Sequence, residues 1–239
     1  MTVERVVLQD PEALARHAAG FVADTLAAAT DRVSVALSGG STPKRLYELL
    51  ATAPFRDRVP WDRVHWFWGD ERFVPPDHPD SNYRMTRLAM LSQAPVPPAN
   101  IHPIPTVGCT PEQAAMTYEY VLQTLYRGNE IDPARPLFEI VLLGLGEDGH
   151  TASLFPGVAA LAERKHWTAA VVGAKPEPRI TLTCPVLGSA RHVVFLVAGA
   201  NKHPVLERLA AGEDLPAGRI RAAGTLHWML DRAAAGDAS

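Results

Sequence analysis

Apolar residues along this chain follow two kinds of spacing, which predict strands that alternate with helices. Nearly continuous apolar runs at residues 33–37, 64–68 and 138–143 are typical of strands covered on both faces of a sheet. Apolar residues at helical spacing mark residues 11–29 and 111–126 as helices. By the same criteria we expect further strands at residues 167–172, 180–183 and 192–197, and further helices at about residues 43–50, 82–91, 202–210 and 226–235.

This order of elements predicts an α/β fold, a three-layer sandwich with a mostly parallel, Rossmann-like central sheet. Five prolines between residues 92 and 106 are typical of a linker, but the alternation of helix and strand resumes after them. We therefore interpret that stretch as a loop and expect a single domain over residues 1–239.

The composition, with 47% hydrophobic and 21% charged residues, is that of an ordinary globular protein. The 26 acidic and 23 basic residues leave a formal charge of -3, so we expect neither nucleic acid nor a membrane as a partner. Cys109 and Cys184 form no CxxC motif, which favours free thiols in a reducing compartment. The charged N-terminus lacks the apolar core of a signal peptide, and no apolar run approaches the roughly 18 residues of a membrane span. We expect a cytoplasmic protein.

Ligands of such open sheets bind beyond the carboxyl ends of the strands, so the loops after the strands hold the candidate chemistry. The first loop, SGGSTPKRLY, combines Gly39 and Gly40 with a helix predicted to begin near Pro43, with Thr42 as its cap. Two glycines followed by a helix start favour an anion site. Lys44 lies in the first helical turn, where the helix dipole disfavours a cation unless an anion binds nearby. The alternative is an ordinary capped helix with solvated cations.

Two further loops carry charged residues. Asp70, Glu71 and Arg72 follow an aromatic strand end and open a loop rich in proline and aspartate, which predicts a polar pocket. The alternative is a surface loop whose acidic residues pair with its arginines. Arg179 and Lys202 lie near the start of a later strand and a later helix, and either one alone is more often a solvated surface charge.

The loop after the strand at residues 138–143, GLGEDGHTASLFPG, has two incompatible interpretations. Its glycines have the GxGxxG spacing of a dinucleotide-binding turn. That turn requires a helix that opens within the glycines and an acidic residue after the next strand, whereas here FPG interrupts the helix and no acid follows. Asp148 and His150 make the same loop a candidate catalytic loop. No pair of histidines or cysteines has the spacing typical of a metal site.

Five blocks of the sequence together resemble the 6-phosphogluconolactonase family. They are ALSGGSTPKRLY, GDERFVPPDHPDSNYRM, LLGLGEDGHTASLFPG, RITLT and AGANKHPVL, which occur in that family's order and approximate spacing. The family is similar in fold to the glucosamine-6-phosphate deaminases, which are the main alternative. Arg72, Thr151 and Phe155 stand where the deaminases have tyrosine, isoleucine and a glutamate. That glutamate is thought to assist ring opening, and a lactone needs no such acid because hydrolysis of its ester opens the ring.

The resemblance implies hydrolysis of 6-phosphoglucono-δ-lactone to 6-phosphogluconate, the second step of the oxidative pentose phosphate pathway. His150 is the expected general base, because an ordinary imidazole has a pKa of about 6.5. Asp148 is expected to orient the His150 ring and to stabilise the imidazolium. Arg72 is expected either to stabilise charge on the lactone carbonyl oxygen or to hold the phosphate. Asp70 aligns with the proton-abstracting aspartate of the deaminases and is expected to bind a hydroxyl group or to orient the site.

For the phosphate, the resemblance implies a site made by the glycine loop and distant cations. Its expected members are Gly39, Gly40, Ser41, Thr42, Lys44, Arg179 and Lys202. We expect a sugar-phosphate lactone as the small-molecule partner, no metal or organic cofactor, and a monomer or weak homo-oligomer. Beside a deaminase, two alternatives remain: a non-catalytic sugar-phosphate sensor that uses the same pocket, and a dinucleotide-binding oxidoreductase.

Overall fold

Six parallel strands form the central sheet of the computed structural model, which describes residues 1–237. Their order across the sheet is β1-β9-β8-β5-β2-β3. The strands are β1 (Thr2–Leu8), β2 (Val33–Leu37), β3 (Val64–Trp68), β5 (Phe138–Leu143), β8 (Ala190–Val197) and β9 (Thr225–Asp231). The strands from β8 to β3 are buried along most of their length, as in a parallel sheet covered on both faces. The predicted α/β fold with a mostly parallel sheet is confirmed.

A second sheet is antiparallel and has the order β4-β7-β6. Its strands are β4 (Asp70–Arg72), β7 (Arg179–Leu182) and β6 (Thr168–Val171). Gly69 joins the two sheets, because its N–H donates to the carbonyl of Leu37 at the end of β2 and its own carbonyl accepts from Leu182, both at 2.8 Å. The strands predicted at residues 167–172 and 180–183 therefore exist, but they belong to this smaller sheet.

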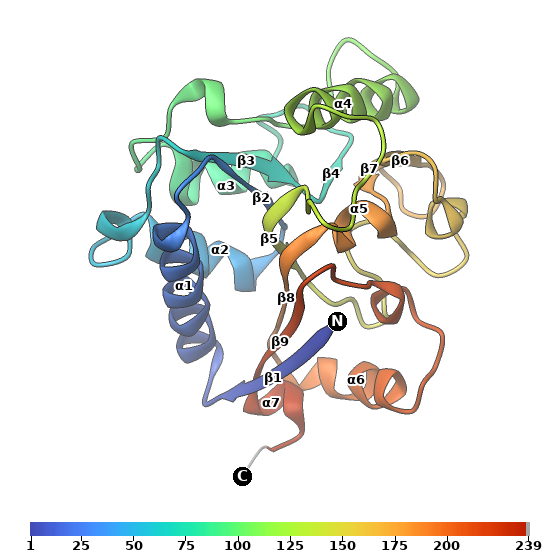
Figure 1. Cartoon of the computed structure of the whole chain (residues 1–239). Coiled ribbons are helices and arrows are strands. Elements are labelled where there is room, and N and C mark those ends of the chain that lie inside the picture. Colours follow the sequence, from blue (N-terminus) through green and yellow to red (C-terminus); the bar gives the residue numbers. More distant parts are fainter. Residues whose placement is uncertain (238–239) are drawn as a thin grey trace.

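Helices cover both faces of the central sheet (Figure 1). On one face α1 (Pro11–Ala28) packs against β1, β9 and the neighbouring α2 (Ser41–Leu50). On the other face α4 (Pro111–Tyr126) packs against β6 and β7. The shorter helices are α3 (Asn82–Thr86), which continues into a π-helical turn over Arg87–Leu91, α5 (Cys184–Gly188), α6 (His203–Ala210) and α7 (Arg232–Ala235).

Side chains along β3 alternate between these two layers. Trp68 packs edge-on against Tyr83 of α3, with ring centres 5.4 Å apart. Phe67 points to the opposite face and lies 6.3 Å from Tyr118 of α4. All four rings belong to or pack against the hydrophobic core. Apolar residues at four of the five positions of β3, interrupted only by His65, are therefore explained by its burial from both sides.

Two buried tyrosines fix the carboxyl ends of neighbouring strands. The hydroxyl of Tyr47 on α2 accepts from the N–H of Ser38 and donates to its carbonyl, at 3.0 and 2.9 Å. The hydroxyl of Tyr118 makes the same two bonds to Trp68, at 2.8 and 3.1 Å. Burial raises the pKa of both phenols, so both remain protonated donors at neutral pH. The loops that follow β2 and β3 thus start from rigid positions.

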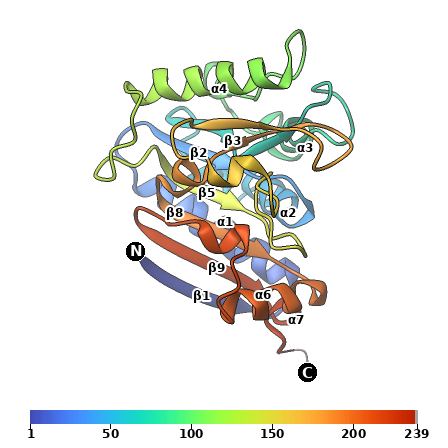
Figure 2. The same cartoon turned by 90° about the vertical axis from the view of Figure 1, so that its right-hand side faces the viewer.

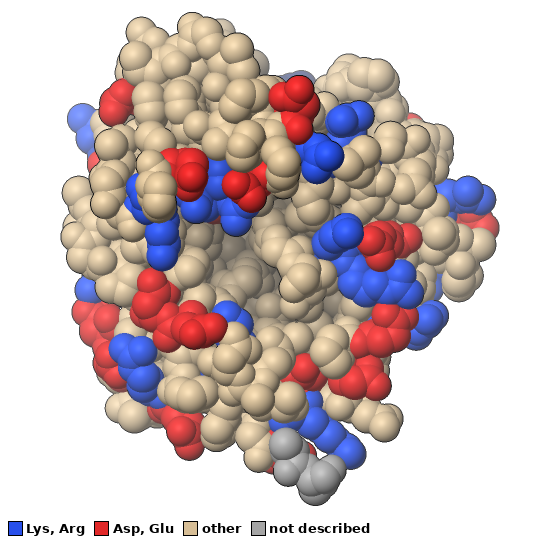
Figure 3. Space-filling model, turned by 180° about the vertical axis from the view of Figure 1, so that it is seen from behind, with Lys and Arg blue, Asp and Glu red and all other residues tan. Residues whose placement is uncertain are grey.

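Because all six strands are parallel, their carboxyl ends share one edge of the sheet. Figure 2 shows β1 and β9 running from left to right, with the N-terminus on the left. Figure 3 views the molecule from behind and therefore faces that carboxyl edge. The loops predicted to hold the chemistry start there.

Three details of the predicted elements are wrong. Residues 226–235 form no continuous helix: β9 ends at Asp231, whose side chain accepts from the N–H of Ala234 at 2.7 Å and so begins α7. β1 is absent from the prediction, because Glu4 and Arg5 interrupt its apolar residues and it lies exposed at the sheet edge. α2 begins at Ser41 with Gly40 as its N-cap residue, two residues before the expected start at Pro43.

Candidate active site

A cavity of 510 Å³, which we call the carboxyl-edge cavity, opens among the loops that follow β2, β3, β5 and β8. Figure 3 shows a hollow near the middle of this face, with basic and acidic side chains around it. Of the predicted site residues, those that line the cavity are Gly39, Gly40, Ser41, Thr42, Asp70, Arg72, His150, Arg179 and Lys202. Segments separated by more than 160 residues are therefore brought together as predicted.

The glycine loop brings its backbone to the cavity wall. A Cβ on Gly39 would lie 2.0 Å from Oδ1 of Asn82, so no other residue fits there without a shift. Gly40 has a φ of 113°, in the region that favours glycine. The sequence predicts Thr42 as the cap of α2, and this prediction is wrong. No side chain among the described residues caps the helix. The first-turn N–H groups of Ser41 and Thr42 are thus free to bind an anion.

His150 and Asp148 form a hydrogen-bonded pair in which the imidazole faces the cavity. Nδ1 of His150 lies 2.5 Å from Oδ1 of Asp148, which also accepts the backbone N–H of His150 at 3.0 Å. Because Nδ1 donates to a carboxylate, Nε2 is left as the basic nitrogen. Burial acts to raise the pKa of Asp148, but its hydrogen bonds from His150 and the nearby charge of Lys175 outweigh burial and hold the pKa below its usual value. Asp148 is therefore ionised at neutral pH.

The glycines of this loop form a tight turn around the histidine. The N–H of Gly146 donates to the carbonyl of His150 at 2.8 Å, and the N–H of Gly149 donates to the carbonyl of Gly146 at 3.0 Å. A Cβ on Gly146 would lie 2.0 Å from Nδ1 of His150. After β5 the next helical residues are the short 3-10 turn Ala159–Ala162, so no helix opens within the glycines as a dinucleotide-binding turn requires.

Two arginines face each other across the small sheet at the cavity wall. In the pairing of β4 with β7, Arg72 stands directly opposite Arg179. Nη1 of Arg72 donates to the carbonyl of Asp80 at 2.6 Å, whereas Nε of Arg179 is buried without a hydrogen-bond partner among the described residues. Burial and the positive charge of Arg72 lower the pKa of Arg179. Opposed like charges destabilise a strand pair, so this arrangement favours a multiply charged anion in the cavity.

Asp70 is buried at the start of β4. Its Oδ2 accepts from the hydroxyl of Ser153 at 2.6 Å, and Nδ2 of Asn82 donates to its backbone carbonyl at 2.9 Å. Ser153 is fully buried and follows Ala152, which has a φ of 48°. A non-glycine residue with left-handed backbone angles is strained by on the order of 1–3 kcal/mol. Here the strained residue is Ala152, next to Ser153, whose hydroxyl reaches Asp70.

Glu71 has a supporting task. The alternation of β4 places its side chain on the face opposite to Asp70 and Arg72. Burial raises the pKa of Glu71, although three backbone donors oppose this effect. Its carboxylate ties the loop before α3 to the small sheet. The four donors, at 2.7 to 3.0 Å, are the N–H groups of Arg72, Asn82 and Tyr83 and the hydroxyl of Ser81.

Lysines on three different segments of the chain have different environments. Lys202 ends the short turn after Gly199 and lines the carboxyl-edge cavity. Lys175, which is absent from the prediction, also lines it. Lys44 does not line the cavity, and its ammonium lies 3.7 Å from Oε1 of Glu48 on the same helix.

Within residues 1–237, no three histidine, cysteine or acidic side chains are placed to hold a metal ion together. In the same part of the chain, no helix has the length and apolarity needed to cross a membrane.

The family described as "Glucosamine-6-phosphate isomerases/6-phosphogluconolactonase" matches residues 9–228. The chain belongs to this family. A relative named 6-phosphogluconolactonase from Synechocystis sp. is 50% identical over 207 residues, which are 84% of this chain and 82% of the relative. The predicted resemblance is therefore confirmed.

Solved structures agree with this membership of the family. The 6-phosphogluconolactonase from Trypanosoma cruzi has a TM-score of 0.85 and 31% identity, and the match covers 100% of this chain and 98% of that one. A monomeric glucosamine-6-phosphate deaminase has a TM-score of 0.80 over 100% of both chains, with 20% identity. The predicted likeness to the deaminase fold is confirmed, while the low identity to this deaminase supports no more than the fold.

Phe155 is the position at which the sequence predicts a difference from the deaminase branch of the family. Its side chain is buried, and its ring centre lies 4.6 Å from that of His150. Lys175 lies on the same ring, 5.2 Å from its centre. An apolar ring therefore contacts the histidine at the position where the resemblance gives the deaminases a carboxylate.

Proposed function

We propose that this chain is a 6-phosphogluconolactonase, which hydrolyses 6-phosphoglucono-δ-lactone to 6-phosphogluconate in the oxidative pentose phosphate pathway. One structural observation carries the proposal: His150, which is hydrogen-bonded to Asp148, lines the same cavity as the opposed Arg72 and Arg179. The first pair suits the activation of water, and the second suits a phosphorylated substrate. The family match and the 50% identical relative support the same reaction.

His150 acts as the general base in this proposal. Its Nε2 takes a proton from the water that attacks C1 of the lactone, and a tetrahedral oxyanion forms. The intermediate collapses by breaking the bond from C1 to the ring oxygen, which receives the proton back from the imidazolium. Asp148 stabilises the imidazolium between the two transfers, a role that its lowered pKa supports.

The phosphate lies against the uncapped start of α2 in this proposal. The backbone of Gly39 and Gly40 and the first turn of the helix supply N–H donors, while Arg179 and Lys202 supply countercharge. Lys44 is left out of the phosphate site because it pairs with Glu48 outside the cavity.

Arg72 and Asp70 share one face of β4, beside the phosphate site. Arg72 serves the carbonyl oxygen or the phosphate, and both roles use its charge. Asp70 binds a sugar hydroxyl, with its carboxylate oriented by Ser153. We also propose that the enzyme works in the cytoplasm without a cofactor, as a monomer or weak homo-oligomer, with Cys109 and Cys184 as free thiols.

A parallel assay of two reactions tests the proposal. Glucose-6-phosphate dehydrogenase generates the lactone in place, and the protein should accelerate its hydrolysis above the spontaneous rate. Glucosamine 6-phosphate should release no ammonia, since Phe155 replaces the deaminase carboxylate. Ammonia release would favour a deaminase, and binding of 6-phosphogluconate without turnover of the lactone would favour a sensor.

A further inference from the structure

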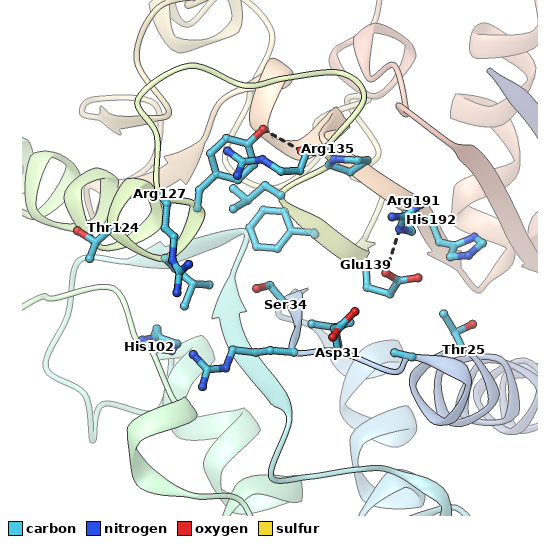
Figure 4. Close-up of a pocket in the computed structure, with 18 of the residues that line it drawn as sticks. Thr25, Asp31, Ser34, His102, Thr124, Arg127, Arg135, Glu139, Arg191 and His192 are labelled. Carbon is cyan, nitrogen blue, oxygen red and sulfur yellow. Dashed lines mark hydrogen bonds and ion pairs between the residues drawn. The ribbon is translucent and has the colours of Figure 1, made fainter.

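A second and larger cavity, of 1310 Å³, lies at the amino ends of β2, β5 and β8. We call it the amino-edge cavity. The central sheet separates it from the carboxyl-edge cavity, because parallel strands begin at one edge and end at the other. Its walls come from the end of α1, the second half of α4 and the loop that follows α4 (Figure 4). Its volume exceeds the roughly 300–1,000 Å³ of typical ligand pockets.

Four arginines and two acidic residues line this cavity, although the chain as a whole has a charge of -3. Within residues 1–237, only one of the four has a carboxylate partner: Nε of Arg191 lies 3.3 Å from Oε2 of Glu139. Arg135 lies on the face of Tyr126, with its guanidinium 4.0 Å from the ring centre. The side chains of Arg32 and Arg127 make no hydrogen bond or ion pair with any described residue. The cavity therefore holds a local excess of positive charge.

The guanidinium groups of the cavity are not the groups that bind the last carbonyls of the surrounding helices. Helix C-termini attract arginines, but at the end of α1 this role belongs to Arg63, whose Nη1 donates to the carbonyls of Ala29 and Thr30 at 2.9 and 3.1 Å. At the end of α4, backbone N–H groups of Arg127 and Gly128 bond to the last carbonyls. Among the described residues, the guanidinium groups of Arg32 and Arg127 are left without a structural partner.

The backbone at Arg127 supports a binding role for its side chain. Arg127 has a φ of 56°, at a helix end where glycine is the preferred residue. Its side chain extends from the end of α4 into the space above His102 (Figure 4). The loop that follows is held in place, because the hydroxyl of Tyr126 donates to the carbonyl of Arg135 and accepts the N–H of Asp132, both at 2.8 Å.

An aromatic surface lies beside the arginines. Tyr120 lines the cavity from α4 and is 71% exposed, although it is a large hydrophobic side chain. Arginines pair with phosphate oxygens, and an exposed aromatic ring stacks on the flat face of a base.

We propose that the amino-edge cavity binds a nucleoside polyphosphate, whose phosphates contact Arg32, Arg127 and Arg135 and whose base stacks on Tyr120. This binding is independent of the lactone reaction proposed for the carboxyl-edge cavity. The 1310 Å³ volume accommodates both parts of such a ligand.

Calorimetric titration with three probes at low ionic strength tests this proposal. ATP without Mg²⁺ should bind the intact protein in a 1:1 ratio, tripolyphosphate should bind more weakly, and adenosine should not bind measurably. Arg32→Ala combined with Arg127→Gly should weaken ATP binding about tenfold or more, because charge-assisted hydrogen bonds are lost. Glycine suits the backbone at residue 127, so this variant is expected to fold. Tyr120→Ala should weaken ATP binding while leaving tripolyphosphate binding unchanged.

Matched variants separate this site from the rest of the surface. Arg5→Ala removes an arginine from exposed β1, outside the cavity, and should leave ATP binding unchanged. Arg179→Ala should also retain ATP binding, and the Arg32→Ala, Arg127→Gly variant should hydrolyse the lactone at the normal rate. The proposal is wrong if ATP fails to bind at millimolar concentration, if the double variant binds it equally well, or if 6-phosphogluconate displaces it. Stronger binding of single-stranded DNA than of ATP would also overturn it.

Discussion

His150 is the residue on which hydrolysis should depend most. His150→Ala removes the proposed base, so kcat should fall by about 10²- to 10⁴-fold with little change in KM. The measurement requires freshly generated lactone and subtraction of its spontaneous hydrolysis. His17→Ala, at an exposed position of α1, is the control. Wild-type hydrolysis by the His150 variant would show that another group activates the water.

Arg179 should contribute to binding of the phosphate and little to the chemical step. We expect Arg179→Ala to raise KM for the phosphorylated lactone by about 10- to 100-fold while kcat changes little. With unphosphorylated gluconolactone, the variant and the wild type should have the same kcat/KM. A fall in kcat at unchanged KM would contradict the anchor role.

The same pair of substrates decides between the two roles of Arg72. If Arg72→Ala impairs hydrolysis of both lactones, the guanidinium acts at the carbonyl, and if only the phosphorylated lactone is affected, it acts at the phosphate.

At the residue scale, the sequence identified the side chains that lie within recognisable motifs. It missed side chains that only orient another site residue. His150, Arg72 and Arg179 line one cavity, as the sequence predicted. Asp148 lies directly beside it, hydrogen-bonded to His150. Ser153 could not be assigned to Asp70, because 83 residues separate them and only the fold joins them.

Among the elements, the glycine loop before α2 gives a prediction with a built-in control. Gly39→Ala places a Cβ 2.0 Å from Oδ1 of Asn82, so it should destabilise the protein by about 1–3 kcal/mol and lower activity as Asn82 moves away from Asp70. Gly20→Ala lies within α1, 3.8 Å from Phe55, and should stabilise the protein by about 0.5–1 kcal/mol. Denaturant unfolding of both variants measures whether the free energy of unfolding falls for Gly39→Ala and rises for Gly20→Ala. Equal stability of the Gly39 variant and the wild type would show that the loop adapts.

Element prediction succeeded for nearly continuous apolar runs and failed for one exposed strand and for one junction between a strand and a helix. The nearly continuous apolar runs of β2, β3 and β5 have the predicted bounds, because both of their faces are covered. Exposed β1 gave no such signal. The apolar residues of β9 and the alanines of α7 together imitate a helix, and only the cap at Asp231 separates the two elements.

For the whole molecule, buried histidines predict a loss of stability in acid. His65 is buried against His102, with Nδ1 and Nε2 2.8 Å apart, and burial and the nearby charges lower its pKa to about 4. Burial also lowers the pKa of His102, His192 and His227. Unfolded histidines titrate at about pH 6.5, so the unfolded chain binds more protons below that pH. The free energy of unfolding should therefore fall as the pH falls from about 6.5 towards 4.

Urea unfolding at several pH values measures this dependence. His65→Gln should flatten the slope in that window, whereas His17→Gln, at an exposed position, should leave it unchanged. An identical slope in the His65 variant and the wild type would show that other groups dominate the acid response.

The opposed Arg72 and Arg179 have a practical consequence for handling the protein. Without an anion between them the two guanidinium groups repel each other, so inorganic phosphate in a storage buffer should raise the melting temperature and also inhibit the enzyme competitively. A ligand at about 100 times its Kd stabilises by about 2.7 kcal/mol. In Arg179→Ala both effects should shrink together, and a melting temperature that is unaffected by phosphate in the wild type would show that the repulsion is already relieved. Rates measured in phosphate buffer should therefore underestimate the activity of the uninhibited enzyme.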